Sequence, residues 1–330
     1  MNANFLKLLT HFRRQDLKNF KTEHDDLYSK AIESGDHLEV TSHYYSVMST
    51  VIDEYFGGNF HFVPPVYDGQ PLEEALKSLH MRIGNKLNLK EGVKCLDIGC
   101  GIGGVMLDVA DMGATMTGVT IAKNEAEIGN ERFAALGLSD RCNIVAADCH
   151  HMPFDDNTFD VAYAIYSLKY IPKLEKAMKE IHRVLKPGGK FIVYDLIKTN
   201  KYDEENEDHK DTLYHLEYAC GMPSLHTQRE VEKSAEDSGM ILREQENLEK
   251  IYDGRAFHYC FSSSPFFMWL VNSSIIDGSI RMAETLRILP TGFKQFNRTF
   301  LCGTVNSIVD GGRKGILSGA DILLFEKNDD

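Results

Sequence analysis

The sequence has little of what marks fibrous, disordered or membrane-spanning chains. It contains 1 Trp and 9 Pro in 330 residues and shows no internal repeat or low-complexity tract, which argues against collagen-like and disordered proteins. Its most apolar stretch, 257–276, is interrupted by His258, Pro265 and Asn272. That stretch falls short of the about 18 uninterrupted apolar residues that a spanning helix needs. The N-terminus has too short an apolar run for a signal peptide, so we expect none.

Cysteine pairs with metal or redox spacing are also missing. The 7 cysteines are odd in number and include no C-x-x-C pattern, which predicts reduced thiols in a cytoplasmic protein. The neighbours His150 and His151 rarely converge on one ion from a loop, and no third ligand has metal-like spacing. We therefore expect no metal site.

Basic residues are outnumbered by acidic ones. The 36 Lys and Arg against 49 Asp and Glu give a net charge of −13. Such a charge repels phosphate backbones and anionic lipid headgroups unless a local basic patch overrides it. We therefore expect no nucleic-acid partner.

A regular alternation of strands and helices occupies the middle of the chain. The pattern predicts strands at 94–98, 115–120, 142–146, 159–164, 190–196 and 241–248, with helices between them. Such an alternation is typical of an α/β protein whose parallel sheet is covered on both faces. The helix before the strand at 190–196 is expected to stop at Pro187-Gly188-Gly189.

The alternation divides the chain into three parts. Residues 1–70 read as helical and polar and end in an aromatic, glycine-rich segment. Residues 71–249 form the predicted core. Residues 250–330 break the rhythm, hold the one Trp, and return to a last core strand near 321–327.

A glycine turn after the strand at 94–98 indicates a nucleotide site. Residues 96–104 read LDIGCGIGG, where residues without Cβ let the backbone approach a ligand closely. The glycines also satisfy the G-x-G-x-x-G pattern of nicotinamide-dependent oxidoreductases, but those need an acid about 20 residues further on. The next strand ends at Thr120 without one. Asp97 instead suits a ligand that carries an ammonium and a sulfonium.

These residues resemble the first motif of the class I S-adenosylmethionine-dependent methyltransferases. Residues 146–154 look like the family's loop after the third strand, and 159–163 and 185–190 look like its fourth strand and the turn before its fifth. The resemblance implies a Rossmann-like, doubly wound, mostly parallel seven-stranded sheet and S-adenosylmethionine as cofactor. The implied cofactor contacts are Asp97, Gly99, Cys100, Gly101, Thr120, Ile121, Asn124, Asp148, Cys149 and Ala164.

One of these positions departs from the commoner pattern of the family. Thr120 stands near the place where a ribose-binding acid is usual. Its hydroxyl could make one such bond, or Asn124 or Glu125 could substitute.

Outside the core the resemblance narrows to the sterol methyltransferases and covers about 40–330. The segments 53–62, 201–209 and 309–314 are similar to peripheral motifs of that family. The resemblance implies a sterol acceptor, an N-terminal helical lid over the cofactor, with Tyr45 as a lid contact, and a C-terminal insertion. It leaves open a homo-oligomer and a peripheral contact of a cytoplasmic protein with the endoplasmic reticulum membrane.

The acceptor end departs from the enzymes that methylate side-chain carbon 24. Those carry a pattern like I-E-A-T-C-H-A-P after the fourth strand, whereas 165–172 reads IYSLKYIP, so Tyr166 replaces the acid and Tyr170 the histidine. Methylating a side-chain alkene creates a carbocation that needs carboxylates or aromatic faces. The loss of the acid disfavours carbon 24.

The sequence looks most like the nematode-type sterol 4-methyltransferase branch, which methylates ring carbon 4. A carbon beside a 3-ketone is acidic, so a base and an enolate-stabilising donor would generate the carbon nucleophile. Tyr166 and Tyr170 are candidate donors, and Asp53 and His61 are candidate bases. Packing is the competing interpretation for both tyrosines and for His61.

Three other activities stay open at this point. They are methylation of side-chain carbon 24, methylation of another lipid, and non-catalytic binding of sterol or cofactor by a degenerate homologue. The aromatic residues at 257–269 either wall a sterol pocket or belong to a core.

Overall fold

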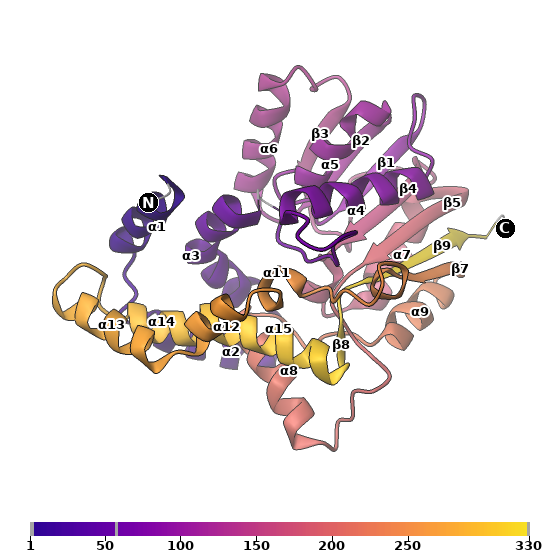
Figure 1. Cartoon of the computed structure of the whole chain (residues 1–330). Coiled ribbons are helices and arrows are strands. Elements are labelled where there is room, and N and C mark those ends of the chain that lie inside the picture. Colours follow the sequence, from indigo (N-terminus) through magenta and orange to yellow (C-terminus); the bar gives the residue numbers. More distant parts are fainter. Residues whose placement is uncertain (1–2, 57–58, 329–330) are drawn as a thin grey trace. The chain divides into compact units, whose positions relative to one another are not determined.

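The computed structural model describes residues 3–56 and 59–328, with the backbone alone at 3–6, 8–9 and 53–56. Its contacts divide the chain into two compact units (Figure 1). The helical unit comprises Met1–Phe56, Lys198–Leu225 and His258–Leu317. The sheet unit comprises Gly57–Ile197, His226–Phe257 and Ser318–Asp330. The chain passes between the units five times, and two of these passages fall within the short strands β6 (Ile197–Lys198) and β8 (Leu317–Ser318).

The sheet unit is built on a seven-stranded sheet in the order β3-β2-β1-β4-β5-β9-β7. The strands are β1 (Lys94–Ile98), β2 (Thr115–Thr120), β3 (Cys142–Ala146), β4 (Phe159–Ile165), β5 (Leu185–Tyr194), β7 (Met240–Asn247) and β9 (Asp321–Lys327). β1 to β5 pair in parallel, while β9 runs antiparallel between β5 and β7. The doubly wound, mostly parallel seven-stranded sheet predicted from the sequence is confirmed.

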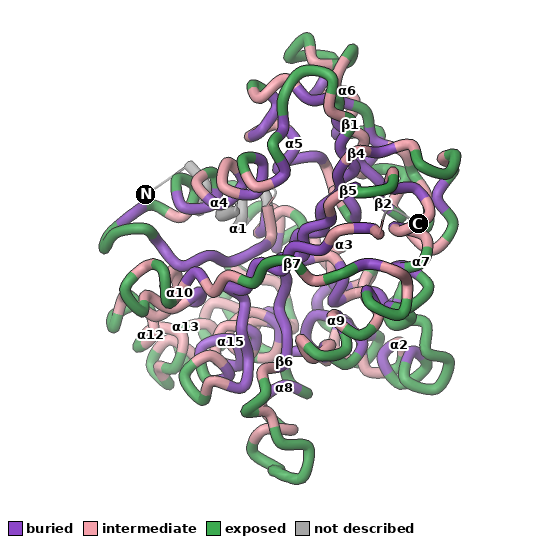
Figure 2. Tube along the Cα trace, turned by 90° about the vertical axis from the view of Figure 1, so that its right-hand side faces the viewer, coloured by how far each residue is buried: buried purple, intermediate pink, exposed green. Residues whose placement is uncertain are grey.

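Helices cover this sheet as the alternation predicts. They are α4 (Leu72–Lys86), α5 (Gly104–Val109), η1 (Ala110–Met112), α6 (Lys123–Ala135), η2 (Leu168–Tyr170), α7 (Leu174–Val184), α9 (Gln228–Glu236) and α10 (Leu248–Ile251). On α7, Ala177, Met178 and Ile181 recur at helical spacing and are fully buried against the strands. Buried positions accordingly dominate the central strand β4 (Figure 2).

The start of β5 differs from the sequence-based expectation. The strand begins at Leu185, which pairs with Phe159, rather than at 190, and it ends at Tyr194 rather than at 196. Pro187-Gly188-Gly189 is a bulge within the strand, because the next pair is Val161 with Lys190. Gly188 adopts a left-handed φ of 68° there. The predicted turn therefore exists, but it interrupts a strand instead of separating a helix from one.

The helical unit brings together segments that are far apart in the sequence. Its helices are α1 (Ala3–Arg14), α2 (Phe20–Ser34), α3 (Leu38–Phe56), α8 (Glu207–Ala219), α11 (Tyr259–Ser262), α12 (Pro265–Asn272), α13 (Ser274–Thr285), α14 (Phe293–Phe296), η3 (Asn297–Cys302) and α15 (Gly303–Lys314). Phe20 and His24 of α2 contact the ring of Phe300 edge-on, at 5.0 and 4.8 Å between centroids. Aromatic packing thus joins the N-terminal and C-terminal segments of this unit.

Candidate active site

The glycine turn lies at the carboxyl end of β1 and holds its backbone in conformations that favour glycine. Gly99, Gly101 and Gly103 have φ values of 74°, 53° and 79°. A Cβ on Gly99 would lie 2.3 Å from Cβ of Ser167, whose hydroxyl donates a hydrogen bond to the carbonyl of Ile98 at 2.6 Å. A Cβ on Gly101, by contrast, would meet nothing within 4 Å, so the backbone there is open to a ligand, as the sequence motif predicts.

Asp97 is buried beside this turn. Its side chain is 2% exposed, and the hydroxyl of Tyr163 donates to Oδ2 at 2.9 Å. Burial raises the pKa of Asp97 to about 7, although the bond from Tyr163 acts in the opposite direction. A cationic ligand would favour the ionised carboxylate, so the site suits the ammonium of S-adenosylmethionine. Tyr163 was not predicted, because a tyrosine inside a strand is indistinguishable from core.

The end of β2 supplies three of the predicted cofactor contacts. The hydroxyl of Thr120 donates to Oε2 of Glu125 at 2.6 Å. Two of the three ribose-binding candidates, Thr120 and Glu125, are therefore hydrogen-bonded to each other. The third, Asn124, is exposed at the start of α6. Ile121 is 57% exposed, which leaves its side chain available to an apolar ligand surface.

The loop after β3 places Asp148 and Cys149 at the same edge of the sheet. Although partial burial raises the pKa of Asp148, hydrogen bonds from the backbone and ring of His150 lower it below its usual value. Ligand atoms of these three residues lie within 4.8 Å of one another. Burial raises the pKa of Cys149 to about 12, which disfavours the thiolate that metals bind. The arrangement suits a hydrogen-bonding ligand better than a metal.

Two further predicted contacts lie on this part of the sheet. The backbone N–H of Cys100 donates to the carbonyl of Val119 at 3.0 Å, which ties the glycine turn to β2. Ala164 is fully buried near the end of β4.

Tyr166 directly follows β4 in an unusual backbone conformation. Its φ is 51°, which is uncommon for a bulky residue and costs about 1 to 3 kcal/mol. The ring is 5% exposed, and its hydroxyl donates to the carbonyl of Gly319 at 3.1 Å. Tyr170 lies in η2 with its residue partly exposed. Because the hydroxyl of Tyr166 donates its hydrogen to the carbonyl of Gly319, it can donate to a substrate only if that bond is exchanged.

A buried ammonium that the sequence analysis missed lies between these tyrosines. Nζ of Lys169 lies 4.2 Å from the ring centroid of Tyr166 and 5.1 Å from that of Tyr170. The same atom donates to the carbonyl of Tyr166 at 2.8 Å and lies 4.0 Å from Oδ1 of Asp195. Lys169 is 3% exposed. A lysine in the otherwise apolar run 168–172 was the signal that could have identified it.

His61 is buried next to Tyr166, with 5.8 Å between ring centroids. Burial holds the pKa of His61 well below its ordinary value, and electrostatic interactions with His80 and Lys169 lower it further. Its Nε2 lies 2.6 Å from Nε2 of His80, whose Nδ1 lies 2.6 Å from Oδ2 of Asp108. His80 and Asp108 were also missed, because packing of α4 against α5 brings them together.

The two predicted site residues of the N-terminal segment lie on α3. The side chain of Asp53 lies outside the described residues. The ring of Tyr45 packs edge-on against Tyr44 at 5.3 Å between centroids. Both positions belong to the helical unit, so their cofactor and acceptor contacts stay predictions.

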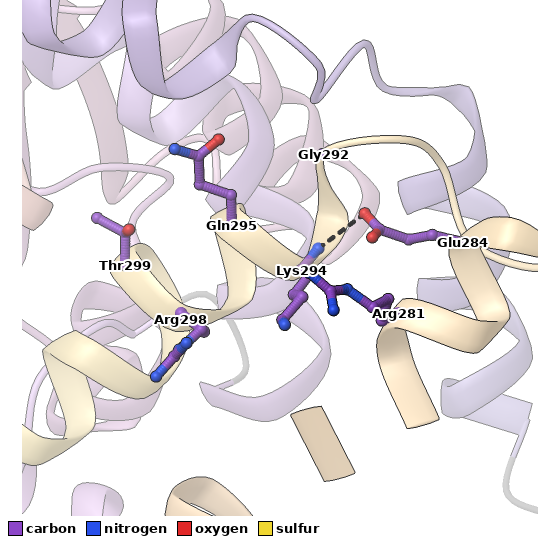
Figure 3. Close-up of a pocket in the computed structure, with 7 residues that line it drawn as sticks. All are labelled: Arg281, Glu284, Gly292, Lys294, Gln295, Arg298 and Thr299. Atoms are coloured by element: carbon purple, nitrogen blue, oxygen red, sulfur yellow. Dashed lines mark hydrogen bonds between the residues drawn. The ribbon is translucent and has the colours of Figure 1, made fainter. Parts of the chain in front are cut away.

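An open pocket of about 520 Å³ lies in the helical unit, and none of the predicted site residues lines it (Figure 3). It is lined by Arg281, Glu284, Gly292, Lys294, Gln295, Arg298 and Thr299. A carboxylate oxygen of Glu284 accepts a hydrogen bond from the backbone N–H of Lys294 at 3.0 Å. The lining is polar and includes three basic side chains, which does not suit the carbon skeleton of a sterol.

Comparisons with known proteins agree with the geometry of the sheet unit. A family profile described as "Methyltransferase domain" matches residues 96–193. The chain is 79% identical over 327 residues to sterol 4-C-methyltransferase strm-1 of Caenorhabditis elegans, covering 99% of this chain and 98% of that protein. It is 29% identical to a sterol 24-C-methyltransferase of Yarrowia lipolytica, covering 89% and 80% respectively.

Solved structures with the same fold include the [4+2]-cyclase SpnF, with a TM-score of 0.62 and 24% identity over 86% of this chain and 93% of that one. A geranyl diphosphate methyltransferase in complex with GPP and sinefungin has a TM-score of 0.62 and 17% identity over 82% and 90%. These likenesses show the fold alone. The sheet, its glycine turn and the near-full-length similarity together show that this chain belongs to the sterol methyltransferase family and uses S-adenosylmethionine.

Proposed function

We propose that the chain transfers a methyl group from S-adenosylmethionine to ring carbon 4 of a sterol, through the enol or enolate of a 3-ketone. The similarity to a protein named sterol 4-C-methyltransferase supports the position on the ring. The structural observation that carries the proposal is the buried ammonium of Lys169 over the rings of Tyr166 and Tyr170.

That ammonium argues against methylation of side-chain carbon 24. Such a reaction creates a carbocation, which aromatic faces or carboxylates stabilise. Here one face of each tyrosine is already covered by a cation, and the carboxylate expected at position 166 is absent. A second positive charge nearby would be repelled, whereas the developing negative charge of an enolate oxygen would be attracted.

The cofactor supplies an electrophilic methyl group on a sulfonium. In this proposal Asp97 binds its ammonium, the backbone from Gly99 to Gly101 approaches it closely, and Thr120 with Glu125 and Asp148 hold its nucleoside. These contacts would hold the methyl donor in one orientation toward carbon 4. Orientation of this kind can supply effective molarities of about 10⁵ M or more.

The chain's own groups handle the proton and the oxygen charge. A base removes the proton from carbon 4, the C–H electron pair becomes the C3=C4 bond, and the π pair of the carbonyl moves to oxygen. That pair then returns, and the C3=C4 pair forms the new bond from carbon 4 to methyl while the methyl–sulfur bond breaks and leaves its electron pair on sulfur. His61 suits this role because its lowered pKa keeps it neutral at pH 7. Asp53 is the alternative base. Tyr166 would have to exchange its bond to Gly319 for one to the substrate oxygen, while Tyr170 is the second candidate donor.

The test compares a 3-keto sterol and its 3-hydroxy counterpart, both deuterated at carbon 4. The proposal predicts that the ketone is methylated with loss of one deuterium, with a primary isotope effect, and that the alcohol is not turned over. Methylation that retains all deuterium at carbon 4 would overturn the proposal. The roles of the donors and bases fail if Tyr166→Phe and Asp53→Asn both leave turnover unchanged while the cofactor still binds.

We also propose that the helical unit contacts a membrane surface, from which a cytoplasmic enzyme would draw its sterol at the endoplasmic reticulum. No helix among the described residues is long and apolar enough to span a bilayer. On α12 and α13, however, Phe266, Trp269 and Ile275 are 66%, 50% and 69% exposed. Exposed aromatic and aliphatic side chains of this kind insert at lipid interfaces.

Vesicle sedimentation tests this contact. Phe266→Ala with Trp269→Ala is expected to lose most binding to phosphatidylcholine vesicles. Ile128→Ala with Leu136→Ala, which removes exposed apolar groups from α6 and the residue that follows it, is the matched control and should bind like the unaltered protein. Equal binding by both double variants would contradict the proposal.

A further inference from the structure

Three ionisable side chains, His61, His80 and Asp108, contact one another in series. The series runs from the buried candidate base His61 to the partly exposed carboxylate of Asp108. His61 and His80 are 3% and 0% exposed, and the side chain of Asp108 is 28% exposed. The two contacts in the series, Nε2 to Nε2 and Nδ1 to Oδ2, both measure 2.6 Å. All three residues belong to the sheet unit.

Local packing explains why a histidine occupies this buried position. The buried face of α4 is otherwise apolar, with Leu76 and Leu79 before His80 and Ile83 after it. A polar ring on such a face is costly unless both of its nitrogens have partners. His61 and Asp108 satisfy both nitrogens of His80, and α5 presents Asp108 because α4 and α5 pack together.

The contacts fix where the hydrogens lie when both histidines are neutral. The carboxylate of Asp108 can only accept, so Nδ1 of His80 carries a hydrogen and its Nε2 has a lone pair. Nε2 of His61 must then donate to that lone pair. Nδ1 of His61 is left with a lone pair, and it makes no hydrogen bond to any residue that the structure describes. The contacts with His80 and Asp108 thus hold His61 in the tautomer whose Nε2 carries the hydrogen and whose Nδ1 can accept a proton.

His61 lies close in sequence to a residue that contacts the start of α5, and its ring lies close to that of Tyr166. Two residues before His61, the side chain of Asn59 lies against Gly104, so closely that a Cβ on Gly104 would be 2.2 Å from it. Gly104 begins α5 directly after the glycine turn. On its other side His61 neighbours Tyr166, where the acceptor is proposed to lie.

We propose that His80 and Asp108 are positioning residues that allow His61 to act as the base, an inference that rests on the proposed reaction at carbon 4. Nδ1 of His61 takes the proton from carbon 4, and its Nε2 proton passes to Nε2 of His80. The positive charge then resides on His80 beside the carboxylate of Asp108, and His61 is neutral again in its other tautomer. The electron pair of the broken C–H bond stays with the substrate, so charge and protons balance.

The charged groups around His61 and His80 favour transfer of the proton from His61 to His80. A cation on His61 would be repelled by the ammonium of Lys169 in η2 and would be buried away from water. A cation on His80 faces a carboxylate at 2.6 Å instead. The ring of Tyr166 lies 5.8 Å from that of His61 between centroids, and the backbone N–H of His61 donates to the carbonyl of Asn59 at 2.9 Å. The second carboxylate of the region, Asp195, is paired with Lys169.

The experiment separates proton transfer from methyl transfer by following hydrogen exchange at carbon 4. A 3-keto sterol is incubated in deuterium oxide with the enzyme and S-adenosylhomocysteine, which carries no transferable methyl. Asp108→Asn is the main variant, because it keeps the shape of the side chain and removes its charge. Asp111→Asn, three residues further along and exposed, is the matched control. Asp108→Glu tests rescue.

We expect Asp108→Asn to slow exchange and methylation about 10- to 100-fold, with cofactor affinity and thermal unfolding unchanged. Without the carboxylate of Asp108, the pair His61 and His80 binds a proton less tightly. The pH at which the rate falls off on the acidic side should therefore move to a lower value, and the maximum rate should also be lower. Asp108→Glu should recover part of the rate, and Asp111→Asn should match the unaltered enzyme.

Two results would overturn the proposal, and they can be told apart. If the unaltered enzyme exchanges and methylates carbon 4 but Asp108→Asn changes neither the rate nor the pH profile, the relay is wrong and the proposed function stands. If the unaltered enzyme does neither at carbon 4, the proposed function fails and takes the relay with it.

Discussion

Asp97, His61 and Lys169 are three buried ionisable side chains of the sheet unit, and each is stabilised by a different neighbour. Tyr163 donates to Asp97, His80 contacts His61, and Lys169 lies over the ring of Tyr166. Burying an ionisable group shifts its pKa toward the neutral form unless a partner opposes the shift. Such residues accordingly gather where a protein binds charged ligands or moves protons.

The pKa of Asp97 gives a prediction for cofactor binding. Below pH 7 its carboxyl is mostly protonated, and a cationic ligand must displace that proton. Affinity for S-adenosylmethionine should therefore rise about tenfold between about pH 6 and pH 8 and then level off. Isothermal titration calorimetry at several pH values measures this rise.

Two variants control the Asp97 prediction. Asp97→Asn should bind weakly and lose this component of the pH dependence. Tyr163→Phe removes the bond that lowers the pKa of Asp97, so the midpoint should move to higher pH. A midpoint unchanged in both variants would show that another group controls binding.

Single residues also show what the sequence could predict. Asp97 and the glycines follow from a local motif whose spacing carries the chemistry. His80, Asp108 and Lys169 do not, because a histidine on an apolar helix face or a lysine after a strand acquires its role only from tertiary partners. Their chemistry depends on contacts between residues 26 to 28 positions apart.

At the scale of elements, the turn between β1 and α5 combines a left-handed backbone with a close approach to another segment. Gly92, in the turn before β1, has a φ of 86°, and a Cβ added there would meet nothing within 4 Å. Gly99 has a φ of 74°, and a Cβ added there would meet Ser167. Substitution of Gly92 would cause backbone strain alone, whereas substitution of Gly99 would cause both backbone strain and a steric clash with Ser167.

Alanine at these two positions should have different effects. Both Gly92→Ala and Gly99→Ala should destabilise the fold by about 1 to 2 kcal/mol, since alanine disfavours the left-handed region. Only Gly99→Ala should also weaken cofactor binding, by tenfold or more, because the turn must shift away from Ser167. Denaturant unfolding and calorimetric titration check the pair. Unchanged cofactor affinity in Gly99→Ala would contradict the assignment of the turn.

Elements were predicted well where their pattern was local. The strands and α7 follow from apolar periodicity, while the bulge in β5 does not, because pairing with β4 overrides the turn tendency of Pro187-Gly188-Gly189. The antiparallel position of β9 between β5 and β7 likewise depends on long-range pairing.

At the scale of the whole molecule, the chain interleaves its two units. The sheet unit carries the cofactor motif and the proposed proton relay, and the helical unit collects the N-terminal helices with the segment 258–317. The aromatic contact between Phe20 and Phe300 in the helical unit joins two residues that are 280 positions apart in the sequence. Periodicity within single segments contains no information about such partners.

The most direct test of the account is the position of the transferred methyl group. The unaltered enzyme is incubated with S-adenosylmethionine labelled with carbon-13 in its methyl group and a 3-keto sterol that offers both a free carbon 4 and a side-chain alkene at carbon 24. The account predicts that nuclear magnetic resonance of the product shows the labelled methyl on ring carbon 4, with the alkene intact. A labelled methyl at carbon 24, with carbon 4 unchanged, would contradict it.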